Sequence, residues 1–233
     1  MKKLPRNLRH LLLLLALALL LAPLAAQEQS VRPGFNRKFD NPDWSYWVAA
    51  FENPSREIYN KRYAIVAATG IRPGMDVADI GAGTGLFTRL FASRVAPKGK
   101  VYAVDISAPF IKNILRTCRE QRLTNVVGIV NTPRDVSLPA ESIDLAFITD
   151  TYHHFEYPQN MLASIHRALR PNGRMIIIDF RRDPRISTPW VMQHVRAGKD
   201  TVIREIEAAG FRLVDERPVL HSNYFLRFRK NDR

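Results

Sequence analysis

The sequence predicts an α/β fold in which a mostly parallel, doubly wound sheet carries helices on both faces. Short apolar segments alternate with longer amphipathic ones from residue 55 onward, which is the pattern of repeated strand–helix–strand units. A length of 233 residues suffices for one such domain with a sizeable core. The composition, 46% hydrophobic and 24% charged, is that of a globular protein and excludes a disordered or fibrous chain.

Residues 1–26 have the layout of a secretory signal peptide. Four cationic side chains open the segment: Lys2, Lys3, Arg6 and Arg9. An apolar run of Leu and Ala follows at 11–21, and mostly small residues occupy 22–26, as at a cleavage site. The uncharged stretch 11–27 is shorter than the ~20 residues that a spanning helix needs. We therefore expect an exported, periplasmic protein, with an uncleaved anchor at 11–27 as the alternative.

Charge and cysteine content limit the partners. The chain carries 35 Lys and Arg against 22 Asp and Glu, a net charge of +13 that favours anionic partners. Because we expect export, we predict no nucleic-acid partner, and peripheral contact with a membrane surface stays open. The single cysteine, Cys118, excludes a disulfide within the monomer and a zinc site built on paired thiolates.

An aromatic-rich segment at residues 27–54 precedes the main domain, which we place at 55–233. Its aromatic side chains are Phe35, Phe39, Trp44, Tyr46, Trp47 and Phe51. So aromatic a segment is expected to pack on the domain as a cover or lid. Ser55 is a good N-cap, and it predicts a helix to residue 69, which Gly70 ends.

The elements of the main domain follow in a regular order. Strands are expected at 75–80, 100–104, 126–130, 143–148 and 174–179, and helices at 84–95, 107–122, 158–169 and 199–209. Two further strands, 211–220 and 224–229, have no helix between them. These two are therefore expected to pair antiparallel, as a hairpin at one edge of the sheet.

A glycine-rich loop and an acid after the second strand predict a nucleoside site. The loop contains Asp79, Gly81, Ala82, Gly83 and Gly85. It joins a strand to a helix, where open sheets bind ligands, and its glycines allow tight turns and close approach. Asp105 is placed to accept hydrogen bonds from ribose hydroxyls. A dinucleotide fingerprint would need glycine at Leu86, so a nucleoside without a pyrophosphate fits better.

These motifs resemble those of class I S-adenosylmethionine (SAM)-dependent methyltransferases. VADIGAGTGLFTRL is similar to their first motif, VYAVDIS to the second, and LPAESIDLAFITDTYHHF to the segment of the fourth strand. ALRPNGRMIIIDF resembles the approach to the fifth strand, usually L-x-P-G-G, with Asn172 replacing the first glycine. The resemblance spans residues 55–230. It implies a Rossmann-like, seven-stranded sheet, mostly parallel with a reversed C-terminal strand, and SAM as cofactor.

The resemblance also implies which residues bind SAM. They are Asp79, Gly81, Ala82, Gly83, Gly85, Asp105, Ile106, Thr132 and Asp150. The glycines would pass under the amino-acid part of SAM, Asp79 would support the loop or the SAM ammonium, and Asp105 would hold the ribose. Thr132 stands where many relatives have an acid that contacts the adenine amine, and Asp135 is the nearest acid. Adenine contacts in this region therefore stay open.

Catalytic residues are expected where the fourth and fifth strands end. The candidates are Tyr152, His153, His154 and Asp179. A histidine of near-neutral pKa is a suitable general base for a hydroxyl or thiol acceptor, and His194 could close over the same pocket. We predict no metal site, because no tight ligand spacing is present. The oxygen and imidazole ligands of a divalent metal are nevertheless all available in Asp150, His153, His154, Glu156, Asp179 and His194.

The leading functional prediction is SAM-dependent methyl transfer. The chain would align O, S or N of a small-molecule or lipid-like acceptor in line with the methyl group. The alternative is a non-catalytic SAM- or nucleoside-binding module of the same fold in the cell envelope. The N-P-P-[YFW] motif of amino-group DNA methyltransferases is absent, since Asp150-Thr-Tyr152-His153 occupies its place.

Overall fold

The computed structural model describes residues 28–231. The expected signal peptide, and the alternative anchor at 11–27, lie outside the described residues. Among residues 28–231, none of the helices combines the length and the apolar character needed to span a bilayer.

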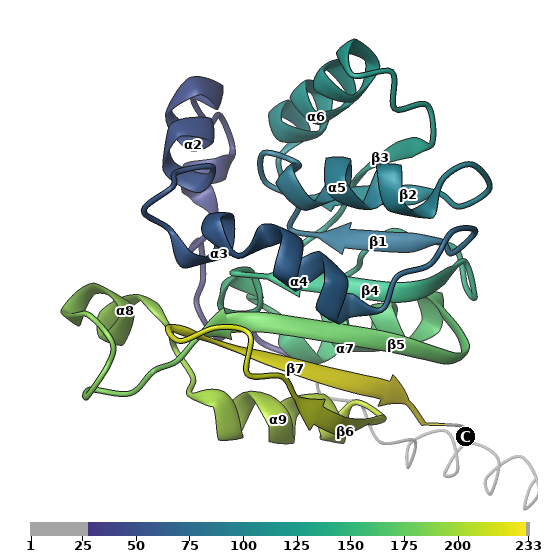
Figure 1. The fold of residues 1–233 in the computed structure, drawn as a ribbon. Helices are drawn as coiled ribbons and strands as arrows, with labels where there is room; N and C mark the ends of the chain where they lie inside the picture. Colours follow the sequence, from purple (N-terminus) through teal and green to yellow (C-terminus); the bar gives the residue numbers. More distant parts are fainter. Residues whose placement is uncertain (1–27, 232–233) are drawn as a thin grey trace, which may run out of the picture.

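One seven-stranded sheet organises the described part of the chain (Figure 1). Its strands are β1 (Val77–Ile80), β2 (Val101–Asp105), β3 (Val126–Val130), β4 (Ile143–Thr149), β5 (Leu169–Phe180), β6 (Phe211–Glu216) and β7 (Asn223–Lys230). They are ordered β3-β2-β1-β4-β5-β7-β6. β7 runs antiparallel to both of its neighbours, and the other pairs are parallel. The predicted fold class and the reversed last strand are confirmed.

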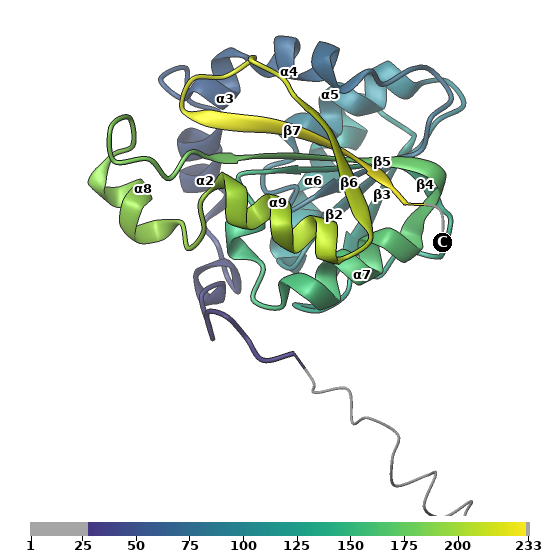
Figure 2. The same cartoon turned by 90° about the horizontal axis from the view of Figure 1, so that it is seen from below.

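Helices cover both faces of the sheet (Figure 2). One face carries α4 (Arg62–Thr69), α5 (Leu86–Val95) and α6 (Ala108–Glu120), and the other carries α7 (Pro158–Ala168) and α9 (Lys199–Ala208). The central strands are buried on both sides, so all four residues of β1 are buried. This two-sided burial explains why the strands are nearly continuous apolar runs rather than alternating ones.

The chain reverses its direction of travel across the sheet between β1 and β4. It proceeds outward from β1 through β2 to β3 and then returns to β4, on the other side of β1. The carboxyl ends of β1 and β4 therefore flank a crevice, which is where open α/β sheets bind their ligands. The glycine-rich loop follows β1, and the Asp150–His154 segment follows β4.

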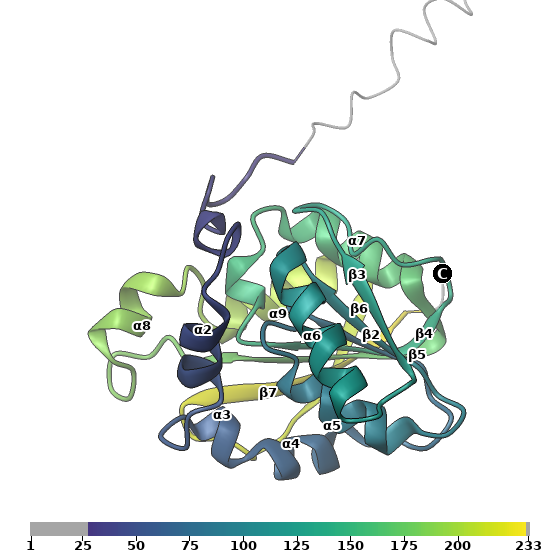
Figure 3. The same cartoon turned by 90° about the horizontal axis from the view of Figure 1, so that it is seen from above.

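Short elements gather at this end of the sheet (Figure 3). They are η1 (Arg37–Phe39), α2 (Trp44–Phe51), α3 (Glu57–Asn60), η2 (Tyr152–His154) and α8 (Pro189–His194). The aromatic segment contains a true helix, α2, which begins at Trp44 because the Asp43 carboxylate accepts a hydrogen bond of 2.9 Å from the Tyr46 amide. The sequence predicted a cover but no helix here.

The structure corrects two boundaries. The single helix predicted from Ser55 is divided into α3 and α4 at Lys61, and Arg56 precedes α3 in an extended conformation. Arg56 forms an ion pair with Asp150, so a tertiary contact rather than the Ser55 cap sets the start. β5 begins at Leu169, five residues before the predicted strand, and includes Asn172 at a positive φ of 62°.

Candidate active site

A single large cavity opens at the carboxyl ends of β1 and β4. It has a volume of about 820 Å³, in the range of small-molecule sites. At one end it is lined by the glycine loop and Asp105, and at the other by His153, His154 and His194. Aromatic side chains line much of the space between and around them: Phe39, Tyr46, Trp47, Phe51, Phe110, Phe180 and Trp190.

The glycine loop owes its shape to contacts with two other parts of the chain, the segment after β4 and α2. Gly81, Gly83 and Gly85 all have positive φ, between 55° and 75°, which favours glycine. A Cβ on Gly81 would lie 2.2 Å from Thr151 Cγ2, and one on Gly83 would lie 3.2 Å from the Phe51 ring. The loop is therefore packed between the β4 segment and α2, and α2 covers its outer side.

Asp105 connects the loop to β2. Its carboxylate accepts hydrogen bonds of 2.8 Å from the Gly83 and Ser107 amides. Burial nevertheless raises the pKa of Asp105 to about 6, because two amide donors do not replace the lost hydration. Burial also raises the pKa of Asp79 to about 7, although Thr88 donates a hydrogen bond of 2.6 Å to this carboxylate. The cavity thus places two acids beside its loop with no cationic side chain bound to either among the described residues.

Asp150 is held at the end of β4 in an uncommon conformation. Its φ is 48°, and its carboxylate pairs with Arg56 and accepts a hydrogen bond of 2.6 Å from Asn223 Nδ2. Burial still raises its pKa to about 6. A non-glycine residue at positive φ costs about 1–3 kcal/mol and is typical of functional sites, where surrounding contacts enforce it.

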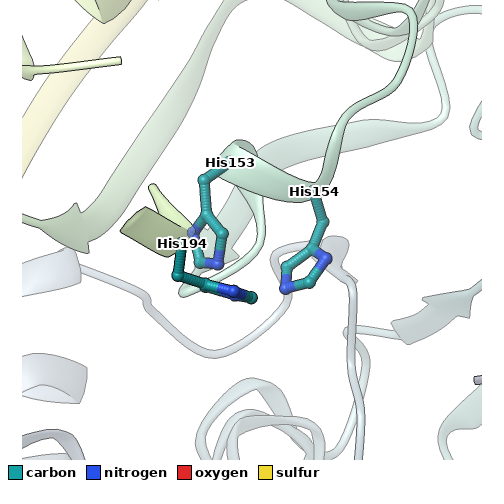
Figure 4. A group of neighbouring side chains, drawn as sticks. All are labelled: His153, His154 and His194. Carbon is teal, nitrogen blue, oxygen red and sulfur yellow. The ribbon is translucent and has the colours of Figure 1, made fainter. Parts of the chain in front are cut away.

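His153, His154 and His194 form a cluster at the far end of the cavity (Figure 4). Their ring centroids lie 4.4 to 5.4 Å apart, and Figure 4 shows the three rings turned toward one shared space. Burial, reinforced by the positive charge that a neighbouring imidazole would add, lowers the pKa of His154 to about 2 and that of His194 to about 4. Both rings are therefore neutral at pH 7.

Residues 30–39 cover this histidine cluster. Glu156 holds the segment by accepting hydrogen bonds of 3.1 Å from Ser30 Oγ and from the Gly34 amide. The Phe35 ring stacks on His154 with centroids 4.8 Å apart and contacts His194 at 5.0 Å. Residues 30–39 thus extend the cover formed by α2 over the histidine cluster.

Comparison with known proteins agrees with this geometry. The family described as "Methyltransferase domain" matches residues 78–177, which contain the glycine loop, Asp105 and the histidine pair. Residues 78–177 therefore match a methyltransferase domain, and the sheet has the fold of SAM-dependent methyltransferases. A SAM-dependent methyltransferase from Aquifex aeolicus has the same fold, with a TM-score of 0.72 at 23% identity over 81% of this chain and 99% of that one.

Two curated relatives are similar over part of the methyltransferase domain. A ubiquinone/menaquinone biosynthesis C-methyltransferase UbiE from Bordetella parapertussis is 31% identical over 121 residues, which are 50% of this chain and 45% of that protein. The corresponding enzyme from Ectopseudomonas mendocina is 32% identical over 127 residues, 52% and 48% of the two chains. The chain thus spans about half the length of the curated relatives it matches.

The residues of the methyltransferase domain fit SAM, the cofactor of this class. SAM carries a sulfonium and an ammonium, and the hydrogen bonds that Asp79 and Asp105 accept within residues 28–231 come from Thr88 and from backbone amides rather than from a cation. The hydroxyl oxygen of Thr149 is buried, its residue lines the cavity, and it has no hydrogen-bond partner in the described chain. Buried polar atoms rarely lack a hydrogen-bond partner, and a bound ligand with hydroxyl and amino groups would supply one for the Thr149 hydroxyl.

The structure places most of the predicted cofactor residues on the cavity wall. Asp79, Gly81, Ala82, Gly83, Asp105, Ile106 and Asp150 line it. Gly85 does not: it is the N-cap residue of α5, and a Cβ there would meet Ile114 at 2.9 Å. Thr132 is exposed and does not line the cavity. Its hydroxyl instead accepts a hydrogen bond from the Arg134 amide within a turn. Its neighbours Asn131 and Pro133 line the cavity instead.

The predicted catalytic residues divide into two groups. His153 and His154 line the cavity. Tyr152 does not reach it, because its ring lies in the core and its hydroxyl donates a 2.7 Å hydrogen bond to Glu205. Asp179 is also away from the cavity wall and contacts His153, whose Nδ1 lies 2.7 Å from its carboxylate. We therefore correct the predicted positions of these two residues: the Tyr152 side chain lies in the core, and the Asp179 carboxylate faces His153 instead of the cavity.

Several cavity residues were not predicted as site residues. Asn36 directly precedes η1, Lys38 lies in η1, and Trp190 lies in α8. The aromatic richness of 27–54 pointed to a cover, but no local pattern in the sequence marks Asn36 as a partner of His154. That contact depends on how a segment 118 residues away packs.

Proposed function

We propose that the protein transfers the methyl group of SAM to a small, mainly apolar acceptor held between α2, α8 and the histidine cluster. One observation carries the proposal: a single cavity joins the glycine loop and Asp105 to the three histidines. A cofactor at one end can therefore face an acceptor at the other without crossing solvent. In the transfer, an acceptor lone pair forms the new bond to carbon while the S–C bond breaks and its electron pair stays on sulfur.

The lining supports an acceptor that bears a ring or a chain. Trp47, Phe51, Phe180 and Trp190 provide flat apolar surfaces, and aromatic side chains bind such groups through area and ring geometry. By their names, the curated relatives are C-methyltransferases of ubiquinone and menaquinone biosynthesis. Quinones are ring compounds, which supports a ring-bearing acceptor, whereas transfer to carbon differs from the O, S or N acceptor proposed here. Lys38 also lines the cavity, so an anionic substituent on the acceptor would find a cationic partner.

Within this proposal, His153 faces the reacting group of the acceptor. Asp179 accepts the hydrogen bond from Nδ1 and so leaves the Nε2 lone pair for the cavity. An acceptor hydroxyl or thiol would therefore meet a lone pair, which is the property of a general base and equally of a metal ligand. Positioning by Asp179 keeps this lone pair in one direction and reduces the reorganisation needed for the reaction.

Binding and turnover test the proposal separately. Calorimetry with SAM and with S-adenosylhomocysteine should show one site, weakened about 10-fold or more in Asp105→Asn and unchanged in Glu120→Gln, whose carboxylate lies on the exposed side of α6. SAM with a trideuterated methyl group should then label a compound in cell extracts, as detected by mass spectrometry. Absence of SAM binding would refute the proposal, and binding without transfer to any extract would favour the non-catalytic module.

A further inference from the structure

Three imidazoles at the acceptor end of the cavity are arranged to share one ion. His153 and His154 come from η2 and His194 ends α8, and one ring nitrogen from each lies within 4.8 Å of the other two. We propose that His153, His154 and His194 form a site for Zn²⁺ or a similar divalent transition metal, with its fourth position open to the acceptor. The inference rests on the proposed function, because it assigns the open position to the methyl acceptor.

The hydrogen bonds of His154 fix which nitrogen it offers. Asn36 Nδ2 donates to the His154 carbonyl at 3.0 Å and to Glu156 at 3.4 Å, so the amide group of Asn36 is oriented. Its oxygen then lies 3.0 Å from His154 Nδ1, which must be the donor. The lone pair of His154 is therefore on Nε2, the nitrogen nearer the centre of the cluster in Figure 4.

His153 is oriented in the same way by an acid. The Asp179 carboxylate lies 2.7 Å from His153 Nδ1 and also accepts the His153 amide at 3.0 Å. Both residues are almost fully buried, with side-chain exposures of 4% and 1%. A carboxylate that holds a histidine by its second nitrogen is the usual support of a metal-bound imidazole, because it fixes the ring and raises its basicity.

The acids that could have joined the cluster are bound elsewhere. Asp150 is paired with Arg56, Asp179 with His153, and Glu156 with residues 30–36. The six-residue set considered from the sequence is therefore reduced to three imidazoles. Three histidines with an open fourth position suit zinc and similar borderline metals rather than calcium or magnesium, which prefer oxygen ligands.

Two cationic side chains near the cluster favour a negatively charged fourth ligand on the metal. Arg32 donates to the His194 carbonyl, and its guanidinium lies 3.6 Å from the centre of the Phe35 ring; Lys38 lies 5.0 Å from the Phe39 ring centre. These cations disfavour a dication in the cluster, and Asp179 offsets only part of their effect. We therefore expect tighter metal binding when the fourth ligand is an anion, such as hydroxide or an ionised acceptor hydroxyl or thiol.

Metal binding requires the cluster to contract. Zinc–nitrogen bonds of about 2.0–2.1 Å at tetrahedral angles place the nitrogens about 3.3 Å apart, which is closer than the 4.8 Å limit of the present arrangement. His153 and His154 are fixed by Asp179 and Asn36. The adjustable residue is His194, which is half-buried, ends the six-residue α8 and stacks on Trp190 with ring centroids 4.3 Å apart.

The test uses the full chain, purified without a histidine tag and stripped of metal. Titration with Co²⁺ should give the visible absorption of a four-coordinate ion at one equivalent per chain, and Zn²⁺ should displace it. His194→Gln and the double variant His153→Gln/His154→Gln should abolish this absorption, and Asp179→Asn should weaken Co²⁺ binding about 10- to 100-fold. The matched control is His221→Gln, because His221 is an exposed histidine outside the cluster, and it should bind as the wild type does.

The outcomes distinguish this inference from the proposed function. SAM binding, measured by calorimetry on the same preparations, reports whether each variant is folded and keeps its cofactor site. Loss of Co²⁺ absorption in the cluster variants with SAM binding retained supports the metal site. A wild-type chain that binds SAM but no Co²⁺, or cluster variants that still bind one equivalent, would overturn the metal site and leave the methyltransferase proposal standing.

Discussion

SAM should bind more tightly as the pH rises from 5 through the pKa of Asp105, which is about 6. Burial raises the pKa of Asp105 from 3.8 to about 6 in the ligand-free protein. Ribose hydroxyls that donate to this carboxylate, and the positive charge of SAM, favour its ionised form and lower its pKa in the complex. Binding below pH 6 therefore releases a proton, so affinity falls as the pH falls.

The size of the effect follows from the pKa shift. A shift of about two pKa units at Asp105 corresponds to about 3 kcal/mol, or about 100-fold in SAM affinity. This is an upper limit, which is reached only if Asp105 has its ordinary pKa in the complex. Between pH 5 and 6 the expected change is at most about fivefold, because half of the Asp105 carboxyls in the ligand-free protein are still protonated at a pH equal to their pKa. The same shift destabilises the ligand-free fold as the pH rises from about 4 to 6, since the folded chain holds this proton more tightly than the unfolded chain does.

Calorimetry at several pH values, in two buffers of different ionisation enthalpy, measures both the affinity and the protons released. Asp105→Asn should flatten the dependence near pH 6, whereas Glu120→Gln should leave it unchanged. An affinity that stayed constant from pH 5 to 7, or that fell with rising pH, would show that Asp105 does not face the cofactor, and the reasoning on this site would be wrong.

Three further predictions concern positions where the structure assigns a definite contact. Tyr152→Phe should lower the free energy of unfolding, measured by urea denaturation, by about 1.5–3 kcal/mol, since it loses the hydrogen bond to Glu205. Loss of methyl transfer in the folded variant would show instead that the Tyr152 hydroxyl takes part in the reaction. Gly83→Ala should cost about 1–3 kcal/mol, because φ is 55° and the new methyl would press on Phe51; unchanged thermal unfolding and SAM affinity would contradict the packing of α2 on the loop. Glu156→Gln should accelerate amide hydrogen exchange in residues 31–36 about tenfold, as charge-assisted hydrogen bonds are lost, and exchange equal to that of the wild type would mean that Glu156 does not hold this segment.

Most of the sheet could be predicted from the sequence because its strands are buried on both faces. Such strands contain continuous apolar runs, as in residues 145–148, and they stand out from the amphipathic helices between them. The start of β5 was missed because Pro171, Asn172 and Gly173 indicate a turn, whereas Leu169 before them already pairs with Ile143 of β4. The register with β4 shifts between Leu169 and Arg174, so the local turn preference is accommodated as an irregularity inside the strand.

The candidate site was predicted unevenly, for a related reason. Asp79, Gly83 and Asp105 lie at positions fixed by one strand–helix–strand unit, β1–α5–β2, so their spacing along the chain already places them. Tyr152 and His153 are adjacent in sequence, yet one side chain enters the core and the other the cavity. Which of the two side chains faces the cavity depends on how the short helix η2 is rotated about its axis, and no residue pattern in the sequence specifies this rotation.

By itself the sequence determined a doubly wound α/β sheet and a nucleoside-binding loop, because both follow from periodicity and spacing within short stretches of chain. Only the tertiary structure decided the acceptor end of the cavity. Asn36, His154 and His194 meet there from three separate segments, and a hydrogen bond between residues 118 positions apart orients the His154 imidazole. Contacts between segments so distant in the chain depend on packing, and packing is a property of the folded molecule.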